Sequence, residues 1–185
     1  MRADKVYLVG FMGAGKTSLA RELGRRLGWK VEDVDDRIES RDGRSIREIF
    51  AQSGETHFRM IERLVVRDLL PLRQVVVATG GGTFADADNR AAIMADGAVA
   101  WVDVPLQVLL DRIPLDGSRP LAPNRTQMEQ LYLLRLPAYA QAHVRLDAAR
   151  LSVGELADVI IEWLGRTEMG TEMGSDLFFS RVREK

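Results

Sequence analysis

The sequence contains no cysteine and only two histidines among its 185 residues. The absence of cysteine excludes a disulfide framework, a thiolate nucleophile and a zinc site with cysteine ligands. Two histidines also argue against a metal centre built from imidazole groups. The sequence therefore argues against a function based on cysteine or on a zinc site with cysteine or histidine ligands.

Lysine is scarce as well, because only four of the 26 basic residues are lysines and the other 22 are arginines. The planar guanidinium of arginine suits phosphate and carboxylate, although coding bias also raises arginine content. With 27 acidic residues the net charge is −1, so bulk charge does not attract nucleic acid and no nucleic-acid partner is expected. An anionic partner must be bound locally.

Long apolar runs are missing too. No stretch approaches the roughly 18 apolar residues of a membrane-spanning helix, and the apolar segment near the N-terminus is too short for a signal peptide. We therefore expect no membrane partner and a cytoplasmic location. The chain is 46% hydrophobic and 29% charged, which is typical of a globular domain, here assigned to residues 1–164. Residues 165–185 repeat TEMG at 167 and 171 and are expected to form an appended tail.

Five short runs rich in β-branched residues alternate with longer helical patterns. This order predicts an α/β fold of three layers, with a five-stranded parallel sheet and helices on both faces. The runs are residues 6–10, 29–34, 74–80, 99–104 and 144–148. Between the first two, Leu19, Leu23 and Leu27 recur every four residues before Gly28, which predicts an amphipathic helix that ends at the glycine.

Capping-box spacing marks the starts of three later helices. The pairs are Ser45 with Glu48, Thr126 with Glu129, and Ser152 with Glu155. Residues 113–125 contain three prolines and a glycine and show no period, so we expect a mobile surface loop that acts as a lid.

Residues 10–17, GFMGAGKT, fit the pattern G-x-x-x-x-G-K-[ST] directly after an apolar strand and directly before a helix. The backbone of such a loop wraps a phosphate with its amides, and the helix adds its free donors and positive dipole end. Lys16 is expected to reach the β- and γ-phosphates, and Thr17 to offer a hydroxyl to Mg²⁺. A glycine turn that only joins strand to helix does not require Lys and Thr in this register. The predicted nucleotide-binding residues are Gly10, Gly13, Ala14, Gly15, Lys16, Thr17 and Ser18.

The motifs D-x-x-G and N-K-x-D do not occur in the chain, which disfavours a GTPase. A kinase acting on a small molecule fits the length, since it needs a nucleotide site, an acceptor pocket and a lid within one domain.

Acidic residues and glycines mark an acceptor side. Asp33 and Asp35 follow the second strand, where strand alternation puts both carboxylates on one face. One could hold metal-bound water and the other could accept a proton, although a solvated strand end or a helix cap explains them equally well. Arg59 and Glu62 lie three apart on a helix, either as an anchored carboxylate-binding pair or as a solvated surface pair. Three glycines at 80–82 permit close backbone approach.

The segments GFMGAGKTS, DVDDRIE, GETHFRMIE, ATGGGT, SRPLA and LRLPAY occur in the order and spacing of one known family. Through them the sequence resembles the shikimate kinases from about Val6 to Leu164. The resemblance implies a P-loop kinase of the nucleoside monophosphate kinase fold. It also implies phosphorylation of the shikimate 3-hydroxyl by ATP and Mg²⁺ in aromatic amino-acid biosynthesis, by an enzyme that is usually a monomer.

The resemblance also implies roles for single residues. Asp35 would bind the shikimate hydroxyls and act as the base, and Asp33 would support Mg²⁺ through water. Arg59 and Arg135 would hold the substrate carboxylate. Arg119 would be the catalytic lid arginine that closes on the phosphates. Further residues implied are Gly80, Gly81 and Gly82 beside the ring, Arg112 and Arg150 at the adenine, and Phe50 and Phe58 at the acceptor pocket, where core packing is the alternative for the two phenylalanines.

Two other functions compete with this interpretation. A related P-loop kinase for another polyol acid, such as gluconate, would share the fold, because fold alone does not fix the substrate. A catalytically idle module that binds ATP and regulates a partner would share the phosphate loop.

Overall fold

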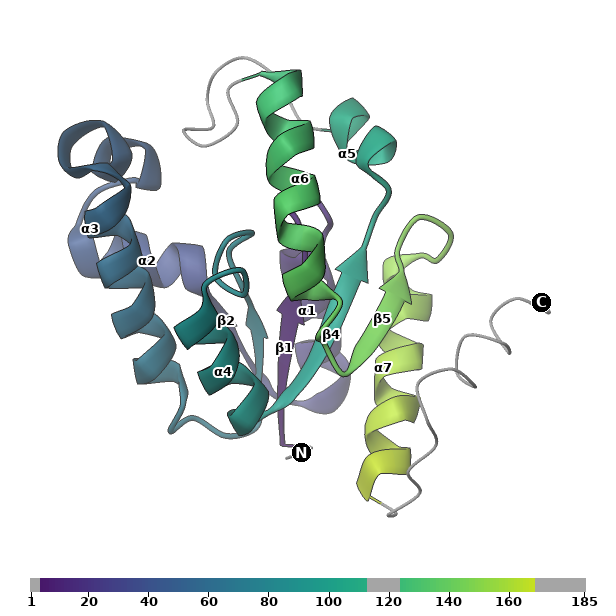
Figure 1. The fold of residues 1–185 in the computed structure, drawn as a ribbon. Coiled ribbons are helices and arrows are strands. Elements are labelled where there is room, and N and C mark those ends of the chain that lie inside the picture. Colours follow the sequence, from purple (N-terminus) through teal and green to yellow (C-terminus); the bar gives the residue numbers. More distant parts are fainter. Residues whose placement is uncertain (1–3, 113–123, 169–185) are drawn as a thin grey trace.

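The computed structural model describes residues 4–112 and 124–168. Within them, five strands form one parallel sheet in the order β2-β3-β1-β4-β5 (Figure 1). The strands are β1 (Lys5–Val9), β2 (Lys30–Asp33), β3 (Val75–Ala78), β4 (Ala98–Asp103) and β5 (Val144–Asp147). Each of the five predicted strands is confirmed, with ends that move by at most two residues.

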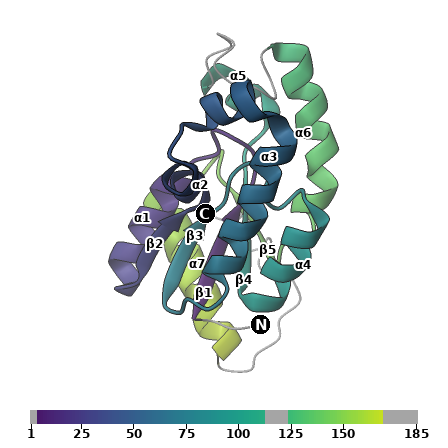
Figure 2. The same cartoon turned by 90° about the vertical axis from the view of Figure 1, so that its left-hand side faces the viewer.

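Helices cover both faces of this sheet. In the described residues they are α1 (Lys16–Leu27), α2 (Val34–Asp42), α3 (Ile46–Leu69), α4 (Ala87–Asp96), α5 (Leu106–Arg112), α6 (Arg125–Tyr139) and α7 (Val153–Glu168). Helices α1 and α7 lie on one face, and α3, α4 and α6 lie on the other (Figure 1 and Figure 2). The predicted three-layer fold is therefore confirmed.

The core is the middle of the sheet. Strands β1, β3 and β4 are buried along their whole lengths, because helices cover them on both sides, and this explains their continuous apolar runs. Strand β2 lies at the edge and is more exposed. Because all the strands are parallel, the loops after their carboxyl ends gather at one edge of the sheet, at the top of Figure 1, where ligands bind in such folds.

Most helix ends follow the local signals in the sequence. Helix α1 ends at Gly28, which has a φ of 68°. The capping box of Ser45 and Glu48 is present at α3. At α7, Glu155 donates its N–H to Ser152 Oγ at 3.3 Å and accepts from the Ser152 N–H at 2.8 Å. These predictions are confirmed.

The predicted capping box at Thr126 is wrong. Helix α6 begins at Arg125, and Asn124 is its N-cap, accepting from the Gln127 N–H at 2.9 Å. The Asn124 amide also donates to the Gln127 side chain at 2.8 Å. Asparagine is at least as good an N-cap as threonine, so the helix starts two residues earlier than the Thr126 signal indicated.

The predicted lid and tail fall mostly outside the described residues. Residues 113–123, which include Arg119, are not described, and Asn124 and Arg125 belong to the start of α6. Helix α7 continues to Glu168, so residues 165–168 extend this helix rather than begin the tail. In the part of the chain that the structure describes, no helix is long and apolar enough to cross a membrane.

Candidate active site

The phosphate loop at residues 10–17 joins β1 to α1, as the sequence predicted (Figure 1). Its glycines Gly10, Gly13 and Gly15 have positive φ angles of 140°, 75° and 93°. Gly15 is the N-cap of α1, and the first turn of that helix contains no acidic residue. The free amides and the positive end of the helix dipole therefore converge on the loop, an arrangement that binds phosphate.

Lys16 lies beneath the same loop. Its ammonium donates to the carbonyl oxygens of Gly10 at 2.9 Å and Phe11 at 2.8 Å. Only 8% of the residue is exposed. The loop is closed further by the N–H of Ala14, which donates to Phe11 at 3.3 Å. A cation is thus held directly against the concave backbone that would receive the phosphates.

Thr17 and Asp33 are hydrogen-bonded across two neighbouring elements. The Thr17 hydroxyl donates to Asp33 Oδ2 at 2.8 Å, joining the first turn of α1 to the end of β2. Both groups are hard oxygen donors of the kind that Mg²⁺ prefers. No cluster of three or more acidic or histidine side chains suited to a metal occurs within residues 4–112 and 124–168. The pair therefore fits an ion that takes its remaining ligands from phosphates and water.

Asp33 and Asp35 do not share one face of a strand, so that expectation was wrong. Strand β2 ends at Asp33, and Asp35 lies in the first turn of α2. Asp33 is the N-cap of that helix, accepting from the Asp35 N–H at 3.0 Å. The strong capping preference of aspartate ends the strand before the alternation can continue. The helix-cap interpretation is confirmed for Asp33, which also binds Thr17.

The Asp35 residue is partly buried and lies close to other acidic groups. Burial, followed by the negative charge of Asp33, raises the pKa of Asp35 to about 6, although the Lys16 cation opposes this shift. A carboxylate whose pKa lies near neutrality can accept a proton from a reacting hydroxyl and release it afterwards. Asp35 therefore has the properties of a general base.

The glycine run after β3 receives side chains from two other elements at very short range. A Cβ atom on Gly80 would lie 2.5 Å from Asp35 Oδ1, and one on Gly82 would lie 2.7 Å from both Nη atoms of Arg59. Non-bonded atoms essentially never come within 3.0 Å of a Cβ atom. Only glycine at these two positions lets the carboxylate of α2 and the guanidinium of α3 come so close to the same turn.

Arg59 is anchored by carboxylates of its own helix. It donates to Glu62 at 2.7 Å and to Glu55 at 3.2 Å. Glu62 is buried, and its other oxygen accepts from the Thr83 hydroxyl at 2.7 Å. Burial opposes the charge of Arg59, but Glu62 and Glu55 outweigh burial and raise the pKa of the guanidinium. The predicted pair with Glu62 is present, and on the Glu62 side it is buried rather than solvated.

Arg135 reaches the same turn from α6. It is 5% exposed, and burial lowers its pKa. A Cβ on Gly81 would lie 3.4 Å from its Nη1 atom. Its guanidinium stands 5.8 Å from the ring centroid of Phe11. Arg135 interacts with the Tyr139 hydroxyl. Among the residues that the structure describes, no acidic side chain forms an ion pair with it, so its charge is available for an anionic ligand.

Tyr139, one turn further along α6, fixes this glycine run. Its hydroxyl donates to the carbonyl oxygen of Gly81 at 2.5 Å. Burial raises the pKa of Tyr139 to about 12, so the hydroxyl keeps the proton that it donates. The turn is thereby fastened to the helix that carries Arg135.

A sequence model of the shikimate kinase family matches residues 12–165 of this chain. The chain belongs to the shikimate kinase family. A curated relative, the shikimate kinase of Persephonella marina, is 36% identical over 157 residues, covering 84% of this chain and 96% of that protein. A solved structure of the shikimate kinase from Acinetobacter baumannii in complex with shikimate gives a TM-score of 0.82 at 34% identity, covering 89% of this chain and 94% of that one.

Membership of the family also bears on the alternative that the chain is a gluconate-type kinase. A gluconokinase from Sinorhizobium meliloti gives a TM-score of 0.61 and covers 97% of this chain and 99% of that chain, but it is only 16% identical. That likeness concerns the fold alone. The shikimate kinase family is therefore favoured over a gluconate-type kinase, which the motifs had left open.

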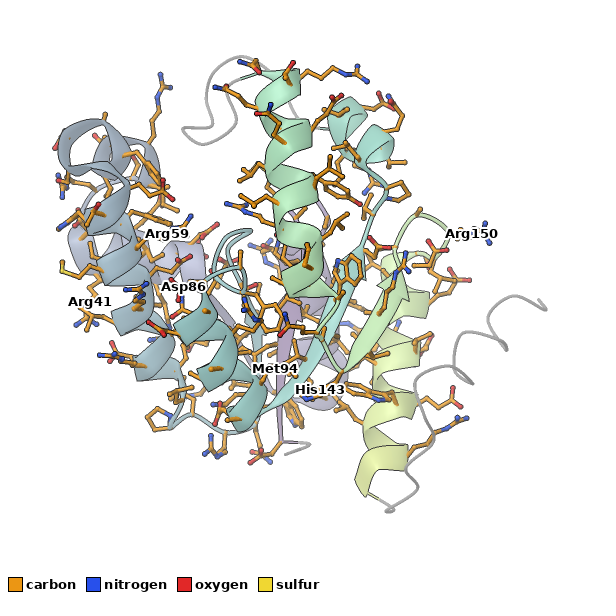
Figure 3. All side chains as sticks on the ribbon, viewed as in Figure 1. Arg41, Arg59, Asp86, Met94, His143 and Arg150 are labelled. Carbon is orange, nitrogen blue, oxygen red and sulfur yellow. The ribbon has the colours of Figure 1, made fainter. Side chains whose placement is uncertain are left out.

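The arginines expected at the nucleotide differ in their positions. Arg112 is exposed at the end of α5. Arg150 lies on the connection from β5 to α7, across the molecule from Arg59 (Figure 3). It is 79% exposed and stands 3.5 Å from Asp147. The structure does not join either arginine to the cluster at the glycine run, and Arg119 is outside the described residues.

Sequence reasoning did not identify Thr83 and Tyr139 as members of the site. Thr83 directly follows the glycine run and is completely buried, and a hydroxyl in that place signals a partner that must be satisfied. Tyr139 lies four residues after Arg135, on the same face of a helix. That spacing was visible in the segment LRLPAY, but its partner Gly81 is 58 residues away.

Proposed function

We propose that this chain transfers the γ-phosphoryl group of ATP to the 3-hydroxyl of shikimate, with Mg²⁺, and releases shikimate 3-phosphate and ADP. The observation that carries the proposal is the meeting of Asp35, Arg59 and Arg135 at one glycine run beside the phosphate loop. A carboxylate-bearing polyol needs two cationic groups at one end and a proton acceptor at the other. These three side chains supply both.

On the acceptor side, Arg59 and Arg135 bind the shikimate carboxylate, and the backbone at residues 80–82 lies beside the ring. The guanidinium groups differ usefully, since Arg59 is held rigid by Glu62 at 2.7 Å while Arg135 has no acidic partner among the described residues. A fixed donor and a cation without an acidic partner together favour the binding of a carboxylate in a defined orientation.

On the nucleotide side, the amides of residues 13–18 and Lys16 bind the phosphates. Thr17 and Asp33 are the residues that would hold Mg²⁺, Thr17 directly and Asp33 through water. When bound, the ion neutralises charge on the β- and γ-phosphates. Further nucleotide ligands proposed from the resemblance are Arg119 on the transferring group and Arg112 and Arg150 at the adenine.

The reaction assigned to these residues is a direct displacement. The 3-hydroxyl gives its proton to Asp35, and its oxygen attacks the γ-phosphorus. The bond from that phosphorus to the bridging oxygen breaks, and ADP leaves. The protein contributes positioning and charge stabilisation, which are the main demands of phosphoryl transfer.

The test is coupled ADP production with and without shikimate. Turnover that depends on shikimate supports the proposal. Turnover with gluconate instead favours the related polyol-acid kinase, and ATP binding with no acceptor-dependent turnover favours the regulatory module.

Arginine variants make the assay specific for the carboxylate site. Arg59→Ala and Arg135→Ala should each raise KM for shikimate on the order of 100-fold, because the bound carboxylate loses one of its two cationic partners. ATP binding should be nearly unchanged. Arg63→Ala is the matched control, since Arg63 lies on the same helix but pairs with Asp86 at 2.7 Å. Unchanged KM for shikimate in both test variants contradicts the assignment.

The proposal includes a monomeric enzyme that acts in the cytoplasm, in keeping with the resemblance. Sedimentation at micromolar concentration tests the first expectation, and fractionation of cells tests the second.

A further inference from the structure

Helix α3 is interrupted at Gly54, where φ is 75° and ψ is 178°. This backbone conformation is open essentially only to glycine. It divides α3 into a first segment, residues 46–53, and a second segment, residues 55–69. A residue with these angles kinks a helix, so the angle between the two segments is set at Gly54. Because the second segment carries Arg59, that angle determines where its guanidinium stands at the glycine run.

Three side chains bridge the break. Arg44 donates to both carboxylate oxygens of Asp42, at 2.5 and 3.1 Å. Arg44 also donates to Gln52 at 3.0 Å and Ser53 at 3.1 Å, which are the last residues of the first segment. Beyond the break, His57 Nε2 lies 2.9 Å from Asp42 Oδ2. One carboxylate at the end of α2 is therefore connected to both segments.

The Asp42 carboxylate is well suited to accept hydrogen bonds from both Arg44 and His57. Its side chain is only 6% exposed, and hydrogen bonds from Arg44 and then His57 lower its pKa to about 2. An ionised carboxylate only accepts hydrogen bonds, so the His57 ring nitrogen donates. Charge-assisted hydrogen bonds of this kind are shorter and stronger than neutral ones. They supply the rigidity that the glycine backbone does not.

His57 and Arg59 project from opposite sides of the second segment, because two positions on a helix differ by about 200°. Holding His57 on one side therefore sets Arg59 on the other. Phe50 and Phe58 add a second contact across the break, with ring centroids 4.8 Å apart. The Arg59 guanidinium stands 5.0 Å from the Phe58 ring centroid, so the same contact supports it.

We propose that Asp42, Arg44 and His57 form a clamp that fixes the break in α3 and so positions Arg59 for the acceptor carboxylate. The inference rests on the proposed function, because it takes Arg59 as a ligand of shikimate. The three residues are positioning residues that act through Arg59. Small misplacements of a binding group matter, since about 1 Å can cost on the order of 100-fold in rate.

The central test removes the His57 contact. His57→Ala should raise KM for shikimate about fivefold, which corresponds to about 1 kcal/mol for one hydrogen bond, while kcat and KM for ATP stay near wild type. His57→Gln keeps an amide donor and should recover most of the affinity. Arg44→Gln removes the other connection and should repeat the rise in KM, so it decides the matter if His57→Ala does not fold.

Arg41→Ala is the matched control. Arg41 pairs with Asp68 and so also joins α2 to α3, but Asp68 lies near the C-terminal end of the second segment, away from Gly54. Its KM for shikimate should stay at the wild-type value. The clamp is overturned if folded His57→Ala and Arg44→Gln both keep the wild-type KM, or if KM for ATP rises equally.

A separate measurement distinguishes failure of the clamp from failure of the proposed function. If the wild-type protein does not turn over shikimate, the proposed function fails, and hydrogen exchange decides whether the break is clamped. Amides of residues 50–59 should then exchange faster in His57→Ala than in Arg41→Ala. Equal exchange in the two variants overturns the clamp.

Discussion

The Tyr139 hydroxyl donates a hydrogen bond to the Gly81 carbonyl oxygen at 2.5 Å. This bond fastens the glycine run to α6, the helix that carries Arg135. Tyr139→Phe keeps the ring but removes the hydroxyl, so the Gly81 carbonyl loses its donor and Arg135 loses its hydrogen bond with Tyr139. We expect KM for shikimate to rise about three- to tenfold, the equivalent of one net hydrogen bond. Steady-state kinetics with shikimate varied at saturating ATP measure this change.

Tyr132→Phe provides the comparison for this variant. Tyr132 lies on the same helix, but its hydroxyl donates to Val104 at 3.3 Å, away from the glycine run. Its KM for shikimate should match the wild type, and both variants should keep their KM for ATP. An equal rise in the two variants points to a general loosening of α6 instead of a specific bond to Gly81.

The raised pKa of Asp35 predicts the pH dependence of turnover. Asp35 accepts a proton only when ionised, and burial together with Asp33 raises its pKa to about 6. The value of kcat/KM for shikimate should therefore fall as pH decreases through about 6, with a slope of one, since kcat/KM reports the free enzyme. A profile that stays flat down to pH 5 removes Asp35 from the role of base.

Asp35→Asn separates stability from activity at this position. The pKa of Asp35 is higher in the folded protein than its ordinary value of 3.8, so the folded state binds the proton more tightly than the unfolded state. Ionisation therefore costs folding free energy, and stability falls as pH rises from about 4 to 6. Asp35→Asn should gain up to about 3 kcal/mol at pH 8 and lose nearly all turnover. Thermal unfolding at pH 8 and at pH 4 measures the gain, which should vanish at the lower pH.

The buried strands and the phosphate loop could be predicted, because each is determined by a contiguous stretch of sequence. Strands β1, β3 and β4 are short apolar runs that are buried on both faces and so show no polar alternation. The phosphate loop has a contiguous pattern that includes its own helix start. Asp33 and Asp35 show where local signals compete. Strand alternation and N-capping both fit the same residues, and capping ended the strand because the Asp33 side chain could satisfy the amide of Asp35 at 3.0 Å.

Contacts between distant residues were not predictable in this way. Lys5, one of four lysines, is fully buried with its ammonium bound to Leu69 at 2.8 Å and to Asp96 at 2.6 Å. No spacing in the sequence relates a strand residue to partners 64 and 91 positions away. The bond from Tyr139 to Gly81 is of the same kind, because it joins residues 58 positions apart.

Gly82→Ala tests whether the close approach of Arg59 to the glycine run matters for binding. The new Cβ would lie 2.7 Å from both Nη atoms of Arg59. Since these atoms are the end of a flexible side chain, the arginine can move away and the fold should lose less than about 1 kcal/mol. A displaced guanidinium no longer meets the carboxylate, however, so KM for shikimate should rise at least about tenfold.

Gly165→Ala is the control for that substitution. At Gly165, in α7, an added Cβ meets nothing within 4 Å, and alanine favours helix by up to about 1 kcal/mol. This variant should unfold at the wild-type temperature or slightly above it and keep its KM for shikimate. Thermal unfolding and kinetics of the two variants together distinguish a steric effect on Arg59 from a general intolerance of replaced glycines. If Gly82→Ala retains the wild-type KM, the space beside Gly82 is not needed by Arg59 for binding the acceptor.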